Sequence, residues 1–394
     1  MSEQTNGWSI SMALKVANRG DVPVFLALQT LAQAKALESE GKEILHLEIG
    51  QPFEGAPADA LENLSTYLRD HPIAYTEALG IRPLREKIAE LYATRYDVQV
   101  PIERIAITVG SSTAFVLSFL CAFEPGDRVA LATPCYPAYR NILIAQGLEP
   151  VELPCNAETQ YQPTTEMLDK LDKPITGLIL ASPANPTGGM LKPDEFEKLI
   201  NWCKANNVRL ISDEIYHGIT FGGVANSALE TTDDAVVINS FSKYFALSGW
   251  RIGWMILPPD LVEPIEKLAQ SFYISAPAMS QYAALEIFDH FDELDGRVAE
   301  YSANRRLLLE RLPKVGLDDF VVPEGAFYFY INVSKYTNDS QDFCARMLNE
   351  IGVAMTPGID FDTERGNQYV RLSFAGPSTD LAGACDRLDG WLKR

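Results

Sequence analysis

The sequence predicts an α/β fold in which a mostly parallel sheet is sandwiched by helices. Five short runs in the middle of the chain are mainly apolar without alternation, as strands are when helices cover both faces of their sheet. These runs are residues 105–108, 128–132, 177–181, 208–212 and 235–239. Helical stretches separate them, and this alternation of patterns favours parallel strands.

The helices are predicted from apolar residues that recur at helical spacing. Residues 59–70 and 194–206 show this spacing, and Pro193 suits the start of the second helix. After about Pro258 the pattern changes to longer helices and two strand-like runs. The helices are residues 261–272, 279–291 and 297–312, and the runs are residues 326–333 and 369–374.

The length of the chain predicts its division into domains. With 394 residues it is too long for one simple core, so we predict two domains. The larger spans residues 47–277. The smaller is an α+β domain that combines residues 1–46, including an N-terminal arm, with residues 278–394.

The composition argues against several classes of function. The formal net charge of −20 opposes binding to nucleic acid or to an anionic membrane, because both need a basic surface. We see no secretory signal in residues 1–20 and no apolar run long enough to span a bilayer. The six scattered cysteines favour a reduced cytoplasmic compartment. The four histidines lack metal-ligand spacing, so no metal site is predicted.

Lys243 gives the clearest chemical signal in the sequence. It follows the predicted strand at residues 235–239, where burial can lower the pKa of its amine and free it to form a Schiff base. Three hydroxyl groups and a guanidinium lie within a dozen residues of it, at Ser240, Ser242, Ser248 and Arg251. This set suits a phosphorylated aldehyde, and pyridoxal phosphate is the obvious candidate. A lone lysine more often caps a strand or reaches solvent, so the prediction depends on the other strand ends.

Three other strand ends carry residues that a phosphorylated cofactor would use. Ser111 and Ser112 are small residues at a predicted helix start, where backbone amides can face phosphate, although an ordinary helix cap has the same composition. A turn rich in Pro and Gly aims the amide of Asn185. Asp213 follows a buried strand, where it needs a cation such as a protonated pyridine nitrogen, or else forms a cap or a structural ion pair. Because ligands gather outside the carboxyl ends of such strands, we expect these groups to meet.

Arg371 is a further candidate because it lies between Val370 and Leu372 in a strand-like run. A buried arginine is expensive unless a carboxylate pairs with it. Its planar guanidinium suits the α-carboxylate of an amino acid, which accepts two hydrogen bonds. An internal ion pair with an aspartate or a glutamate is the alternative.

Together these segments resemble the pyridoxal-phosphate-dependent aminotransferases of the class I/II family, which have fold type I. The resemblance runs from about Ile49 to Phe374. Its motifs are Asn185-Pro186-Thr187-Gly188, Asp213-Glu214-Ile215-Tyr216, Ser240-Phe241-Ser242-Lys243 with Arg251 eight residues on, and Tyr369-Val370-Arg371-Leu372-Ser373-Phe374. It implies a seven-stranded type of sheet in the large domain. It also implies ping-pong transfer of an amino group between an α-amino acid and a 2-oxo acid.

The resemblance also implies a role for each matching residue. Lys243 would hold the cofactor and move the substrate proton, Asp213 would keep the pyridine nitrogen protonated, and Asn185 and Tyr216 would hydrogen-bond the phenolic oxygen. Further cofactor contacts would come from Ser111, Ser112, Tyr136, Ser240, Ser242 and Arg251. Tyr136 among them matches the aromatic residue that stacks on the pyridine ring.

Three more residues complete the set that the resemblance implies. Arg371 and Gly50 would lie at the α-carboxylate of the substrate, together with Asn185. Tyr75 matches the tyrosine that the family donates to the cofactor phosphate of the neighbouring subunit. We therefore expect a homodimer with shared active sites.

The substrate is less well specified. Several aspartate- and prephenate-type relatives have a lysine where this chain has Ser112, so recognition of a dicarboxylate would need another cation. Phe53 and Glu54 are expected near the entrance, and Phe327 and Tyr328 belong either to the pocket or to the core. We expect a neutral or aromatic amino donor, with 2-oxoglutarate or pyruvate as the acceptor.

Two alternatives remain open at this point. A C–S β-lyase or another enzyme of Cα chemistry would use the same fold and the same cofactor. A cofactor-sensing transcription regulator is disfavoured, because only some forty residues precede the match and the chain is strongly acidic.

Overall fold

A seven-stranded sheet forms the centre of the computed structural model, which describes residues 14–393. The strand order is β2-β8-β7-β6-β5-β3-β4. The bounds are β2 Ile105–Thr108, β3 Arg128–Thr133, β4 Glu149–Pro154, β5 Gly177–Ala181, β6 Arg209–Asp213, β7 Val236–Ser240 and β8 Gly253–Ile256. The strand β8 runs in the opposite direction to the other six strands of this sheet. This confirms the prediction of a mostly parallel, seven-stranded sheet.

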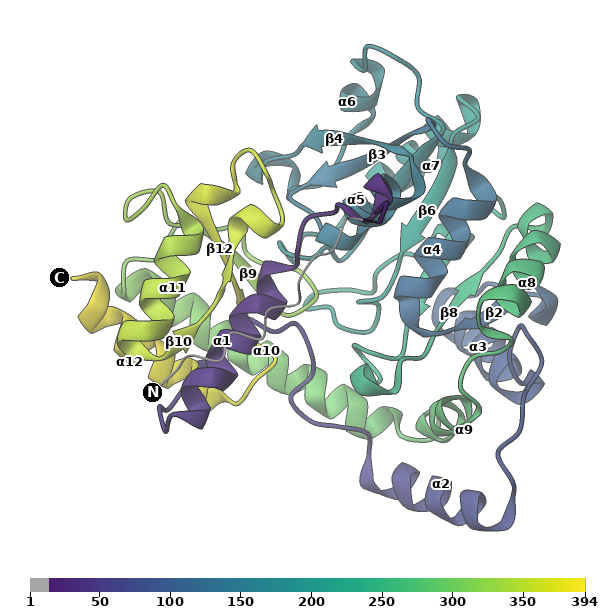
Figure 1. Cartoon of the computed structure of the whole chain (residues 1–394), viewed down its shortest axis with the longest axis horizontal. Coiled ribbons are helices and arrows are strands. Elements are labelled where there is room, and N and C mark those ends of the chain that lie inside the picture. The colour runs from purple at the N-terminus through teal and green to yellow at the C-terminus, as the bar shows by residue number, and fades with distance from the viewer. Residues whose placement is uncertain (1–13, 394) are drawn as a thin grey trace.

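Helices cover both faces of this sheet (Figure 1). The helices of this part of the chain are α2 Ala58–Asp70, which packs against α9 (Ala278–Ile287), and α3 Arg82–Tyr96, α4 Gly110–Ala122, α5 Pro137–Gln146, α6 Thr165–Asp169, α7 Pro193–Ala205 and α8 Pro259–Tyr273. Along β5, Leu178 and Leu180 join the core cluster that contains Leu199 of α7, whereas Ile179 joins the cluster that contains Phe115 of α4. Successive strand residues therefore pack against opposite helix layers, which explains the continuous apolar runs in the sequence.

A second region combines the two ends of the described chain. Its helices are α1 Leu26–Ser39, α10 Phe291–Lys314, α11 Ser340–Ile351 and α12 Ser378–Leu392, and its strands are β1 Leu45–His46, β9 Tyr328–Asn332, β10 Val353–Ala354, β11 Thr356–Pro357 and β12 Tyr369–Ser373. The helix α9 packs against α2 and α3 of the first region. The strands β11, β12 and β9 form an antiparallel sheet, and β1 pairs with β10 in parallel. In Figure 1 α1 lies beside α11, and α10 runs from below α12 to α9. The predicted domain boundaries at residues 47 and 277 stay a prediction, and part of the proposed arm, residues 1–13, lies outside the described residues.

One helix prediction was wrong. The segment 279–291 is not a single helix, because α9 ends at Ile287 and α10 begins at Phe291. The break allows both Phe288 and Phe291 to pack on Phe245, with ring centroids 5.7 and 6.3 Å from it. Aromatic packing close to Lys243 therefore interrupts a pattern that reads as continuous in the sequence.

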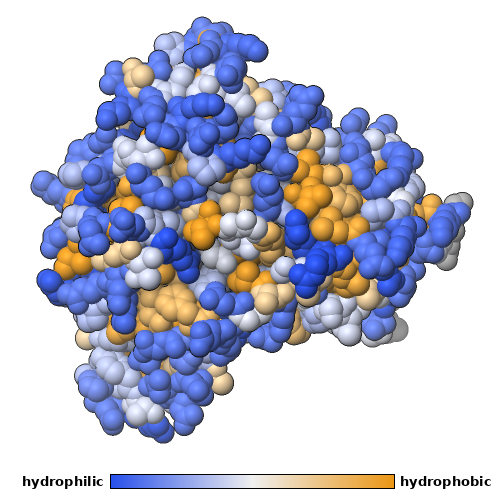
Figure 2. All heavy atoms as spheres, turned by 180° about the vertical axis from the view of Figure 1, so that it is seen from behind, coloured by the Kyte–Doolittle hydropathy of each residue, from blue (hydrophilic) through white to orange (hydrophobic). Residues whose placement is uncertain are grey.

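The surface and the described helices bear on the excluded functions. The face in Figure 2 is mostly hydrophilic, with apolar residues in scattered patches. Within residues 14–393, every helix is too short or too polar to cross a membrane. No cluster of three or more His, Cys, Asp or Glu side chains in that part of the chain is placed to hold a metal ion.

Candidate active site

Four strand ends meet at one edge of the large sheet. Ser111 lies three residues after β2 and Asn185 four residues after β5, while Asp213 and Ser240 are the last residues of β6 and β7. These four strands point the same way, because β2 and β7 are both antiparallel to β8, which lies between them. The topology thus brings the predicted groups to a common edge, as expected for a ligand site in an open α/β sheet.

The amine of Lys243 lies within this edge. Its Nζ atom donates a hydrogen bond to the carbonyl oxygen of Gly50 at 2.6 Å and lies 5.7 Å from the centre of the Tyr216 ring. Burial lowers the pKa of Lys243 to about 8, and the positive charges of Arg371 and Arg251 act in the same direction. Far more of this amine is therefore uncharged near neutral pH than for an ordinary lysine, and the uncharged form can act as a nucleophile or as a base.

Asp213 is almost fully buried and is held by two donors. Its Oδ2 atom accepts a short hydrogen bond from the hydroxyl group of Tyr139, and its Oδ1 atom accepts one from the backbone amide of Ile215 at 3.0 Å. Burial raises the pKa of Asp213 to about 6, although both hydrogen bonds and the charge of Lys243 oppose the rise. The carboxyl group is thus mostly charged above about pH 6, and both of its hydrogen-bond donors are uncharged groups.

The start of α4 and the side chain of Arg251 form a compact cationic corner. A Cβ atom added at Gly110 would lie 2.5 Å from Nη2 of Arg251, and one at Gly253 would lie 2.9 Å from the backbone nitrogen of Ser111. Arg251 also donates from Nη1 to the carbonyl oxygen of Ser248 at 2.9 Å. Free amides at a helix start together with a guanidinium suit a phosphate group.

The serines that the sequence singled out have different positions in this corner. Ser111 and Ser112 lie in the first turn of α4, with Ser111 partly buried and Ser112 exposed. Ser240 and Ser242 are buried, and the hydroxyl oxygen of Ser240 accepts a hydrogen bond from the backbone amide of Ser242 at 3.0 Å. Ser240 and Ser242 therefore shape the turn that carries Lys243.

Arg371, on β12, is buried and has no carboxylate partner within the described part of the chain. Its Nη1 atom donates to Oδ1 of Asn185 at 3.0 Å, its Nη2 atom donates to the carbonyl oxygen of Glu48, and its Nε atom is buried without a partner. The guanidinium lies 4.5 Å from the centre of the Tyr328 ring and 4.8 Å from that of Phe361. The alternative of an internal ion pair is therefore wrong for this residue.

Tyr216, Tyr328 and Gly50 form the wall between Lys243 and Arg371. The hydroxyl groups of Tyr216 and Tyr328 lie 2.7 Å apart and share a hydrogen bond. A Cβ atom at Gly50 would lie 2.0 Å from the hydroxyl oxygen of Tyr328, so only glycine leaves room there. Both Tyr328 and Phe327 are buried in the core cluster, and Tyr328 is the one that contacts the guanidinium of Arg371.

Tyr136 precedes α5 and lies close to Tyr139, with ring centroids 5.5 Å apart. The ring of Phe25, just before α1, lies 5.8 Å from that of Tyr136. Burial raises the pKa of Tyr136 to about 12, and the nearby Tyr328 and Asp213 add to the rise. Tyr136 is therefore a neutral aromatic face bordering the site.

Three predicted residues are not part of this cluster. Tyr75 is 82% exposed. Glu54 forms an ion pair with Arg297, with 3.0 Å between Oε2 and Nε, so its charge is already neutralised. Phe53 beside it is exposed.

Sequence reasoning missed Tyr139 and Phe361, and it predicted Gly50 but not Glu48, two residues before it. These three missed residues reach the site through tertiary packing. The short spacing from Tyr136 to Tyr139, one helical turn, is the one signal that could have pointed to Tyr139.

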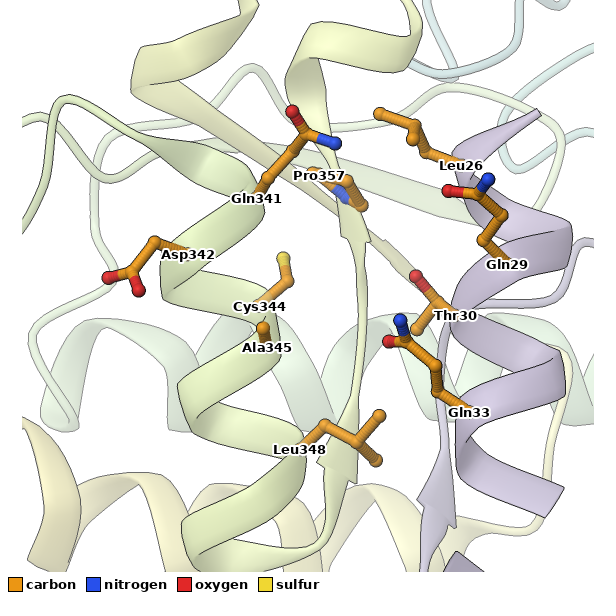
Figure 3. A pocket seen from close by; sticks show the side chains of 10 residues that line it. All are labelled: Leu26, Gln29, Thr30, Gln33, Gln341, Asp342, Cys344, Ala345, Leu348 and Pro357. Atoms are coloured by element: carbon orange, nitrogen blue, oxygen red, sulfur yellow. The ribbon is translucent and has the colours of Figure 1, made fainter. Parts of the chain in front are cut away.

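A separate pocket of about 350 Å³ lies between α1 and α11. Figure 3 shows Thr30 and Gln33 of α1 facing Cys344 and Leu348 of α11, while Asp342 points away. None of the residues described above lines this pocket. This pocket is therefore separate from the candidate active site.

Comparison with known proteins agrees with this geometry. The sequence pattern of the family described as aminotransferase class I and II matches residues 42–388. The chain belongs to this family. A valine–pyruvate aminotransferase of Mycobacterium tuberculosis is 45% identical over 386 residues, which cover 97% of this chain and 99% of that protein. The (5-formylfuran-3-yl)methyl phosphate transaminase of Methanocaldococcus jannaschii is 34% identical to this chain. The match covers 94% of this chain and 97% of that protein.

Solved structures of aminotransferases have the same fold. A crystal structure of an aminotransferase from Mycobacterium tuberculosis superposes with a TM-score of 0.94 and 44% identity, covering 97% of this chain and all of that one. An aspartate aminotransferase from Thermotoga maritima gives a TM-score of 0.90 and 30% identity, with 96% of this chain and all of that one covered. The chain is thus an aminotransferase of fold type I that exchanges amino groups between amino acids and oxo acids. The family depends on pyridoxal phosphate.

Proposed function

We propose that this aminotransferase binds pyridoxal phosphate at Lys243 and transfers the amino group of a neutral α-amino acid to a 2-oxo acid by a ping-pong mechanism. One observation carries the proposal. The low-pKa amine of Lys243 lies close to Arg371, a buried guanidinium whose charge no carboxylate of the described chain neutralises. This combination offers a base for the Cα proton and a partner for the α-carboxylate of one substrate.

The residues at the site fit the cofactor. The N-terminus of α4 and Arg251 would hold its phosphate, because Gly110 and Gly253 leave the space that a side chain would fill. Asp213 would pair with the ring nitrogen, Tyr136 would cover one ring face, and Asn185 and Tyr216 would reach its phenolic oxygen. When bound, pyridoxal phosphate supplies an electron sink that makes the Cα–H bond of an amino acid acidic.

The protein's own groups would then perform three tasks. Arg371 would bind the substrate carboxylate through its guanidinium group, and Asn185 would keep the plane of that group in place. Lys243, uncharged above about pH 8, would accept the proton from Cα and later return it. The aromatic rings of Tyr136 and Tyr328 would exclude water from the neighbourhood of that proton.

A neutral side chain is favoured because the nearby cations are already used. Arg297 pairs with Glu54, and Arg140, one turn after Tyr136, pairs with Glu152 at 3.2 Å. Ser112 replaces the lysine that some dicarboxylate-specific relatives have. Valine and pyruvate are the first substrates to test, because the relative that is 45% identical is named for them. The relatives compared are all transaminases, so the β-lyase alternative gains no support.

We further propose a homodimer in which Tyr75 completes the site of the partner. Thr76 contacts Ser275 and Gln281, at 3.4 and 2.9 Å, which brings the segment before Thr76 close to the start of α9. Four exposed apolar side chains gather on this part of the surface, namely Ile73, Tyr75, Ile274 and Met279. A second copy that covers them would account for their exposure. The unpaired state of all six cysteines supports a reduced, cytoplasmic location.

The experiment is a spectroscopic titration of purified protein loaded with pyridoxal phosphate. Neutral, aromatic and acidic amino acids are added one at a time without an oxo acid, and the visible band of the bound cofactor is followed. We expect valine and other neutral amino acids to bleach the band, and pyruvate to restore it. A response to aspartate alone would overturn the proposed substrate class, and protein that does not take up the cofactor would overturn the proposal as a whole.

A further inference from the structure

The backbone of residues 45–50, here called the carbonyl strap, touches both cations of the proposed active site. The carbonyl oxygen of Gly50 accepts from Nζ of Lys243 at 2.6 Å. The carbonyl oxygen of Glu48 accepts from Nη2 of Arg371 and from the hydroxyl group of Thr356, the latter at 2.8 Å. The position of the strap therefore helps to set the position of both cations.

The strap is anchored at its middle by the second region of the fold. The amide of Leu47 donates to the carbonyl oxygen of Ala354 at 3.0 Å, and the amide of Ser373 donates to the carbonyl oxygen of Leu47 at 2.8 Å. Beyond Leu47 the anchoring depends on Glu48. Its side chain has no exposed surface, and a buried carboxylate is costly unless a cation compensates it.

His46 is that cation. Its Nδ1 atom lies 2.8 Å from Oε1 of Glu48, and its Nε2 atom lies 3.1 Å from Oε1 of Glu38 in the last turn of α1. Two ring nitrogens that both face carboxylate oxygens must both donate, so the ring is an imidazolium. The other carboxylate oxygen of Glu48, Oε2, is buried without a partner in the described chain, so His46 alone compensates the charge.

The two carboxylates raise the pKa of His46 from its ordinary 6.5 to about 9, with the hydrogen bond to Glu48 as the largest cause. They are the charged groups that act on the ring, Glu48 from its own segment and Glu38 from α1. Because the pKa is raised in the folded protein, the contribution of the ion pair to stability is fully present below about pH 6.5 and declines above it, and the ion pair itself is lost as the pH rises through about 9.

We propose that His46 and Glu48 are positioning residues, whose ion pair holds the carbonyl strap so that Arg371 and Lys243 are correctly placed for a carboxylate substrate. The proposal rests on the proposed function. Neither side chain touches the substrate in this scheme. When His46 loses its charge, the carboxylate of Glu48 is left uncompensated, and the strap shifts to reach solvent. The hydrogen bond from Arg371 to the carbonyl oxygen of Glu48 is then the first to weaken. The affinity for substrate therefore falls more than the rate of proton transfer.

The test compares His46→Gln, Glu48→Gln and the double variant in the cofactor-loaded protein. Gln at position 46 still donates a hydrogen bond but carries no charge, so we expect KM for both substrates to rise about tenfold while kcat stays within about twofold. The double variant removes the buried charge as well, and its KM should return toward that of the unmodified protein. His71→Gln, at an exposed histidine on the C-terminal side of α2, serves as the matched control and should change little.

A binding measurement separates this proposal from the proposed function. The dissociation constant of 3-methylbutanoate, a carboxylate without an amino group, is measured by calorimetry at several pH values. In the unmodified protein, binding of 3-methylbutanoate should weaken as the pH rises through about 9. In His46→Gln, binding should be weak at all of these pH values. Equal dissociation constants in the two proteins, or a loss confined to kcat, would overturn the role of His46 and Glu48. Absence of turnover with every amino acid, together with the expected binding pattern, would instead contradict the proposed function alone.

Discussion

The hydroxyl group of Tyr139 donates to Oδ2 of Asp213, joining the first turn of α5 to the end of β6. The bond spans 74 residues of sequence and is completely buried. It is one of the two protein hydrogen bonds that stabilise the charged form of Asp213 against the cost of burial. The state of the carboxyl group at neutral pH therefore depends on Tyr139.

Tyr139→Phe removes this donor without changing the shape of the side chain. We expect the pKa of Asp213 to rise further above about 6, so that less carboxylate is available at neutral pH for a cationic ring nitrogen. Pyridoxal phosphate should bind about tenfold more weakly at neutral pH, and the difference should shrink in alkaline buffer. Fluorescence titration of cofactor-free protein over a range of pH measures this. An equal loss at all pH values would indicate a steric effect instead.

The pKa of Lys243 predicts how fast the cofactor attaches. Only the uncharged amine attacks an aldehyde, and burial lowers this pKa to about 8. The rate of attachment to cofactor-free protein should rise as the pH increases through about 8 and then level off. Stopped-flow absorbance records the rate. A midpoint near that of an ordinary exposed lysine, about 10.4, would contradict the environment described for Lys243. Lys243→Ala should show no attachment at any pH.

The sequence allowed the large sheet and most of the site to be predicted for one physical reason. Strands buried on both faces give continuous apolar runs, and residues 177–181 match β5 while the other four runs agree with their strands to within one residue at each end. Polar residues directly after such runs, such as Asp213, then stand out. Tyr139 and Glu48 could not be found in this way, because their partners are set by packing between distant segments. The strands β4 and β8 were not predicted, and in β4 the two glutamates and two prolines interrupt the apolar run.

The contact between Gly50 and Tyr328 predicts the effect of a single methyl group. Gly50→Ala would place a Cβ atom 2.0 Å from the hydroxyl oxygen of Tyr328, which is itself buried. We expect a loss of about 2 kcal/mol in the free energy of unfolding and a raised KM, because the strap must move. Chemical denaturation and steady-state kinetics measure both effects.

Two further variants test the cause of that loss. Tyr328→Phe combined with Gly50→Ala removes the hydroxyl oxygen that clashes and should recover part of the stability. Gly55→Ala adds a methyl group where no atom lies within 4 Å, and it should be almost neutral. If Gly55→Ala is as harmful as Gly50→Ala, the effect comes from the flexibility of the backbone and not from the close approach of Tyr328.

The exposure of Tyr75 predicts that two chains share each active site. Tyr75→Ala should fold normally, because the side chain is 82% exposed, yet it should lose most activity through weaker cofactor binding in the partner site. Lys243→Ala should be inactive through loss of the amine. When the two inactive variants are unfolded together and refolded, mixed dimers contain one site with both Lys243 and Tyr75. About a quarter of the activity of the unmodified protein should therefore return if the chains pair at random. Mixtures that stay inactive although native mass spectrometry shows mixed dimers would mean that Tyr75 serves its own chain.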